Sequence, residues 1–145
     1  MKYLLNVLVV ICIFNVSSAI GAGFKEKFIG NWVGSAEFTN ISSTWCAAHM
    51  SDGQLKVLFK DVDLTSGKAF PPVLIEGTWS VNGNYLSNSI RVLDLDGNYI
   101  QKELQHEKYK ILKASDDFIA YQGLRQDKTV FESSRVENCS NFLRK

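Results

Sequence analysis

The chain has 145 residues, of which 46% are hydrophobic and 21% charged, and its formal net charge at pH 7 is +1. A near-neutral balance with interspersed signs lacks the basic stripe that binds nucleic acids or anionic membranes, so we expect neither as a partner. A chain of this length and hydrophobic content can form one domain with an adequate core.

The N-terminal segment has the pattern of a secretory signal peptide. Lys2 precedes an apolar run over residues 4–14, and small residues follow at positions 17–19 and 21–23. The run is shorter than the roughly 20 apolar residues that a membrane-spanning helix needs. We predict cleavage after Ala19, with Ala22 as the second choice. Residues 20–145 are then one domain, exported to a periplasm or the extracellular space, with no membrane span in the mature chain.

The next elements are one helical segment and then strands. Phe24 and Phe28 fall on one side of a short helix over residues 24–29, which we interpret as a plug or lid. From residue 32 onward the dominant period is two, as in strands with one buried face. The predicted strands cover residues 32–38, 55–59, 73–82, 85–93, 99–112 (broken or bulged), 118–124 and 128–136, within a total of about eight.

Tight turns separate these strands. Asn82-Gly83 and Asp96-Gly97 are dipeptides that readily take positive φ at both central positions of a hairpin turn. Strands joined this closely are antiparallel neighbours, and no space remains for a crossover helix. The alternatives are an up-and-down barrel and a sandwich, and closure removes exposed edges. We predict an all-β, antiparallel up-and-down barrel of about eight strands after a short N-terminal helical turn.

Two short motifs carry a family resemblance. Gly30-Asn31-Trp32 is a Gly-x-Trp at the first strand after a helical turn, and Arg135 lies in the last predicted strand. The pair resembles the motifs of lipocalins and the wider calycin superfamily, and the short chain is similar to compact bacterial lipocalin-like domains. The resemblance implies that Trp32 and Arg135 stack at the closed end of the barrel, a structural role. It also implies binding and not catalysis, so we expect no enzyme.

The cysteines and histidines allow two interpretations. Cys12 would leave with the signal, and Cys46 and Cys139 would then form a disulfide in an oxidising compartment. Alternatively, Cys46 and His49 could ligate a metal or form a reactive thiol pair. No second ligand pair lies nearby, so the disulfide is favoured, and we predict no metal and no cofactor. Neither His49 nor His106 lies in a triad or zinc-protease motif, so no catalytic residue is predicted.

Two functions remain open. The first is a carrier or sensor that binds a small apolar ligand inside the barrel, in space left by Gly34, Ala36 and Gly77. The second is a protein-binding module, such as an inhibitor or immunity partner of a secreted enzyme, that uses an exposed segment over residues 43–52 with Trp45 and His49. A cavity of about 300 Å³ or more favours the carrier, and a filled core favours the module. The predicted ligand-binding wall consists of Phe38, Phe59, Trp79 and Phe118.

Overall fold

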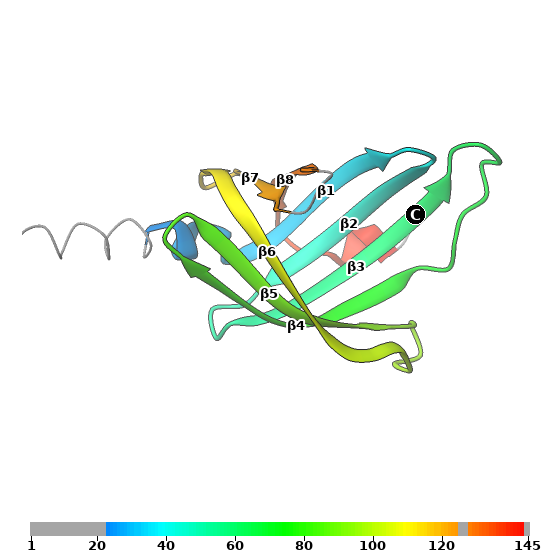
Figure 1. Ribbon diagram of the computed structural model, residues 1–145, viewed down its shortest axis with the longest axis horizontal. Helices are drawn as coiled ribbons and strands as arrows, with labels where there is room; N and C mark the ends of the chain where they lie inside the picture. Colours follow the sequence, from blue (N-terminus) through cyan, green and yellow to red (C-terminus); the bar gives the residue numbers. More distant parts are fainter. Residues whose placement is uncertain (1–22, 125–127, 144–145) are drawn as a thin grey trace, which may run out of the picture.

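Eight antiparallel strands form a closed barrel in the computed structural model, which describes residues 23–124 and 128–143 (Figure 1). Each strand pairs with the next along the chain, and the last pairs with the first, which confirms the predicted up-and-down barrel. The predicted signal peptide, residues 1–19, and both candidate cleavage positions lie outside the described residues. The strands are β1 (Gly30–Phe38), β2 (Ile41–His49), β3 (Gln54–Asp63), β4 (Val73–Asn82), β5 (Tyr85–Leu93), β6 (Tyr99–Ala114), β7 (Phe118–Gly123) and β8 (Val130–Val136).

The two ends of the barrel differ. A short helix over residues 23–28 lies at one end, drawn in blue, and the connection between β3 and β4 extends beyond the other end (Figure 1). Phe28 of this helix is fully buried and belongs to the hydrophobic core. The helix therefore covers what we call the closed end, and we call the opposite end the mouth.

The strand β2 is absent from the sequence prediction. Its inward row consists of Ser43, Trp45, Ala47 and His49. Because Ser43 and His49 are polar and Ala47 is small, the row does not form a clear apolar alternation. Trp45 is 2% exposed and His49 is 4% exposed. The prediction that residues 43–52 present these two side chains on the surface is therefore wrong, because alternate residues of a strand face the barrel interior.

The turn between β4 and β5 lies one residue later than predicted. Asn82 pairs with Tyr85, so the two central residues are Gly83 and Asn84. Gly83 has a φ of +56°. Asn84 does not have a positive φ, because Lys128 is the one non-glycine among the described residues that does. The turn thus places glycine at the first central position, as type II′ hairpins do.

Trp32 and Arg135 meet at the closed end. The guanidinium of Arg135 lies 4.2 Å from the centre of the Trp32 ring, a cation–π contact. Arg135 also donates to the carbonyl oxygens of Lys27 (3.0 Å), Ile29 (2.8 Å) and Asp116. The Trp32 indole is fully buried and donates to the Phe28 carbonyl at 2.7 Å. These bonds attach the helix to β1 and β8.

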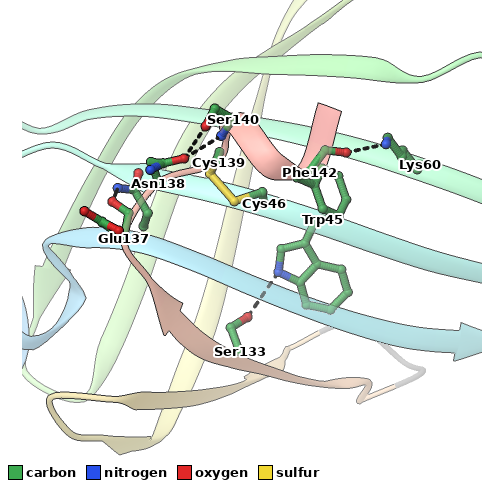
Figure 2. Close-up of a disulfide and its surroundings, with 10 residues drawn as sticks. Trp45, Cys46, Lys60, Ser133, Glu137, Asn138, Cys139, Ser140 and Phe142 are labelled. Carbon is green, nitrogen blue, oxygen red and sulfur yellow. Dashed lines mark hydrogen bonds between the residues drawn. A yellow bond between two sulfur atoms is a disulfide. The ribbon is translucent and has the colours of Figure 1, made fainter. Parts of the chain in front are cut away.

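A disulfide joins Cys46 to Cys139, as predicted (Figure 2). Cys46 lies on the outer face of β2, while its neighbour Trp45 points inward and donates to the Ser133 hydroxyl at 3.1 Å. The C-terminal segment continues into the short helix α2 (Ser140–Leu143), where the Phe142 carbonyl accepts a hydrogen bond from Lys60. The bridge closes a loop of 93 residues and fixes the chain end against the outside of the barrel.

Candidate functional site

A cavity of about 280 Å³ lies inside the barrel. This volume lies just below the size of about 300 Å³ that would favour the carrier, and the interior is not completely filled either, so the volume alone does not separate the two functions. Side chains from all eight strands line it. They are Phe38, Trp45, Ala47, His49, Leu55, Val57, Phe59, Ile75, Asn88, Ile90, Val92, Gln105, Glu107, Tyr109, Tyr121 and Phe131.

Aromatic rings form one wall of the cavity. Phe131 lies at its centre, with ring centroids 5.5 Å from stacked Tyr121, 5.7 Å from Tyr109 and 5.8 Å from Trp45. Trp45 in turn lies 5.7 Å from Phe59. Ring pairs at these separations stabilise the barrel beyond their buried area, so the rings form one continuous packed wall.

Polar side chains from β5 and β6 form the opposite part of the lining. Asn88 and Glu107 are direct cross-strand partners, and Gln105 precedes Glu107 on the same inward row of β6. The Glu107 carboxylate accepts a hydrogen bond from the Tyr109 hydroxyl. Burial, together with the charge of Glu107, raises the pKa of Tyr121, so this phenol stays neutral. The buried Oδ1 of Asn88 has no hydrogen-bond partner.

His49 lies at the end of the cavity nearest the short helix. Its ring makes edge contacts with Trp79 at 5.0 Å and Phe28 at 5.8 Å, and its buried Nδ1 has no hydrogen-bond partner. Burial lowers the pKa of His49 to about 4, because desolvation disfavours the imidazolium. At neutral pH the imidazole is therefore uncharged.

The four predicted wall residues occupy three different environments. Phe38 and Phe59 line the cavity. Trp79 lies deeper, where its indole donates to the Met50 carbonyl at 3.0 Å and its ring is 6.4 Å from Phe28. Phe118 lies on the outer face of β7, with the Lys113 ammonium 5.2 Å from its ring centre. We therefore retain Phe38 and Phe59 as proposed ligand contacts and leave Trp79 and Phe118 out.

The small inward residues contribute less space than predicted. A Cβ atom built on Gly34 would lie 2.4 Å from the Trp45 ring and 2.6 Å from the Ser133 hydroxyl. One on Gly77 would lie 2.0 Å from the backbone oxygen of Ser89. The space beside Gly34 is thus filled by Trp45, and Gly77 permits close approach of two strands.

Sequence reasoning did not identify Asn88, Gln105 or Glu107. The signal was present on β5, because Asn88 interrupts an inward row of Leu86, Ile90 and Val92. It was weaker on β6, where both rows carry polar residues. An inward polar residue in an otherwise apolar row is the pattern that indicates a binding cavity.

A second concave surface lies on the outside of the barrel. This outer groove, about 630 Å³ in volume, runs between α2 and the strands β1, β2, β3, β7 and β8. Lys60 and Phe142 are in contact there, with the Lys60 ammonium 4.7 Å from the ring centre. The groove is larger than the cavity, but none of the unpartnered buried polar atoms found in the described residues lies among its lining residues.

Within residues 23–124 and 128–143, no three His, Cys, Asp or Glu side chains form a potential metal site. In the same ranges no helix is long and apolar enough to cross a membrane. The expected lack of a metal or cofactor stays a prediction.

Comparisons with known proteins give structural likenesses but no match in sequence. No protein-family model matches the chain, and no curated protein matches it in sequence. Among solved structures, a biogenic amine-binding protein (selenomethionine derivative) aligns with a TM-score of 0.49 and 12% sequence identity. The alignment covers 82% of this chain and 69% of that chain. At this degree of overlap the likeness supports no statement about a ligand.

Proposed function

We propose that this protein is an exported, non-enzymatic binding protein that carries or senses a small, mainly apolar ligand inside its barrel. The observation that carries the proposal is the interior cavity of about 280 Å³, with an aromatic wall and two unpartnered buried polar atoms, His49 Nδ1 and Asn88 Oδ1. Buried polar atoms without partners are costly in a filled core but can be satisfied by a bound molecule.

The cavity lining supports a small ligand that is mainly apolar. Most of the described residues that line it are aliphatic or aromatic, with a few polar groups among them. The disulfide supports export, because such bonds persist mainly in oxidising compartments.

The test compares two phenylalanine substitutions at adjacent positions of β2. Ala47→Phe fills the cavity, whereas Ala48→Phe places the same ring on the outer face. The neutral fluorescent probe N-phenyl-1-naphthylamine should bind the native protein and the Ala48→Phe variant, and its affinity should fall at least tenfold in Ala47→Phe. Circular dichroism verifies that both variants fold. Equal affinity in the two variants, or no binding to the native protein, would contradict the proposal.

The alternative function, a protein-binding module, is supported by the outer groove. The disulfide and the Lys60–Phe142 contact fix α2 beside it, so the groove has a defined shape (Figure 2). A secreted enzyme that binds the Ala47→Phe variant as well as the native protein, but not a Phe142→Ala variant, would favour this second function.

A further inference from the structure

Glu107 lies where the cavity meets a lateral opening of the barrel. The strand β7 pairs with β6 only from Tyr109 onward, so residues 99–108 of β6 have no partner in β7 within the described chain. An opening of about 310 Å³ lies there, and its lining includes one lysine, Lys108, beside the carboxylate: His106, Glu107, Lys108, Tyr109, Gly123, Leu124 and Phe131. Glu107, Tyr109 and Phe131 also line the cavity, so a ligand that enters by this route passes the carboxylate.

No cationic side chain balances Glu107 inside the cavity. Among the described residues that line it, none is lysine or arginine, and the one histidine is uncharged at neutral pH. The neighbouring Lys108 faces outward, with its ammonium 4.6 Å from the centre of the Tyr85 ring. The hydroxyl of Tyr109 donates one hydrogen bond to the carboxylate. A half-buried carboxylate with one neutral donor is incompletely compensated.

The groups beside Glu107 are also acceptors. Oδ1 of Asn88, directly across from Glu107, is buried without a partner. Nearer the mouth, strand alternation places Asp61 on the inward row of β3 after Phe59, and its Oδ1 is likewise buried and unpartnered. A ligand with several N–H groups could donate to both Glu107 and Asn88, and an ammonium has three.

The aromatic wall suits the same charge. Tyr109, Tyr121 and Phe131 present rings beside Glu107, and ring faces attract cations by about 0.5 to 2 kcal/mol. The phenol of Tyr121 stays neutral and so adds no competing charge. Apart from Gln105 and His49, the remaining lining is aliphatic and aromatic, which suits an apolar body.

We propose that the ligand is a small organic cation, a protonated amine on an apolar body, with Glu107 as its counter-ion and Asn88 as a second acceptor. This inference rests on the proposed function, since both use the same cavity. It differs from that function by requiring charge on the ligand.

The experiment uses three probes of similar shape: 2-phenylethylamine, which is cationic at pH 7, neutral 2-phenylethanol and anionic 3-phenylpropionate. Displacement of N-phenyl-1-naphthylamine measures each affinity. The amine should bind at least tenfold more tightly than the alcohol, and the carboxylate should bind most weakly. In Glu107→Gln the preference for the amine over the alcohol should fall below threefold, and circular dichroism verifies that the variant folds.

Two further variants complete the test. Glu132→Gln makes the same change on the outer face of β8 and should keep the native preference. Asn88→Asp adds a second carboxylate beside Glu107 and should increase the preference for the amine, which keeps the test decisive if Glu107→Gln does not fold.

The outcomes separate the two proposals. If the fluorescent probe and the alcohol bind in the cavity but the amine binds no better, or Glu107→Gln leaves the preference unchanged, the cation proposal is overturned and the proposed function stands. If none of the four compounds binds the native protein, the proposed function is overturned and the cation proposal with it.

Discussion

The closed end and the cavity of this barrel treat polar groups in opposite ways. At the closed end, the buried Trp32 indole and the Arg135 guanidinium both donate to backbone carbonyls of the helical segment. In the cavity, His49 Nδ1 and Asn88 Oδ1 are buried without partners. Satisfied buried bonds stabilise a fold, whereas unsatisfied ones cost free energy unless something binds to them. One barrel thus contains a region whose buried polar groups are paired and a region where two of them, His49 Nδ1 and Asn88 Oδ1, have no protein partner.

The largest expected effect comes from removing the centre of the closed end. Trp32→Ala deletes a fully buried indole and its bond to the Phe28 carbonyl, so the free energy of unfolding should fall by about 4 kcal/mol. Urea denaturation followed by circular dichroism measures this. Trp32→Phe, which keeps most of the ring, should lose less. A loss below about 1 kcal/mol for the alanine variant would show that the closed end does not support the fold.

Acid should lower the stability of the barrel by protonating His49, which lies at the end of the cavity beside Phe28. Its folded-state pKa, about 4, lies below the ordinary value of 6.5. The unfolded chain therefore binds the proton first, and stability is lost as pH falls from about 6.5 to about 4, by about 3 kcal/mol in total. Urea titrations across this range should show the loss, and His49→Gln should remove most of it. His106→Gln is the control because His106 is exposed and bonds Ser89 outside the core. An identical pH dependence in both variants would contradict the assignment to His49.

A milder change at the closed end tests its hydrogen bonds. Arg135→Lys keeps the charge but loses the planar fork that reaches the carbonyls of Lys27 and Ile29. We expect the free energy of unfolding to fall by about 1 to 2 kcal/mol in urea denaturation. A change no larger than that of an outward substitution such as Lys56→Arg would be evidence against these bonds.

The smallest expected effect has the opposite sign. Asn88→Leu replaces an unpartnered buried acceptor by an apolar group of similar size, so stability should stay equal or rise by up to about 1 kcal/mol. Thermal unfolding measures it. The same variant should bind 2-phenylethylamine more weakly, because one acceptor is gone. A loss of stability above about 1 kcal/mol would mean that Asn88 supports the fold and not a ligand.

Much of the fold was predictable from the sequence, because the strands with apolar inward rows have a clear period of two. β4, with Val73, Ile75 and Trp79 on one phase, is such a strand. β2 was missed because its inward row alternates poorly in hydropathy. In the short β7, Phe118 and Ile119 are both apolar, so the sequence pattern does not show which of them faces inward. Phe118 was therefore included among the predicted wall residues although it lies on the outer face.

The site was less predictable than the fold. Glu107 follows Gln105 on one row of β6, while His106 and Lys108 occupy the other, so both rows look like solvent-facing residues. Only the pairing of Glu107 with Asn88, and of Tyr109 with Leu86, fixes which row faces inward. Pairing between strands is a tertiary property, and a period along one strand does not contain it.

The position of the disulfide has a consequence for how the barrel can open. The ladder between β1 and β8 has only four residue pairs, from Asn31–Val136 to Gly34–Ser133. The bridge runs from β2, on one side of this seam, to the segment that follows β8 on the other. It therefore acts as a strap across the seam and hinders separation of these strands. The gap beside Glu107, where residues 99–108 of β6 have no partner in β7 within the described chain, has no such bridge across it.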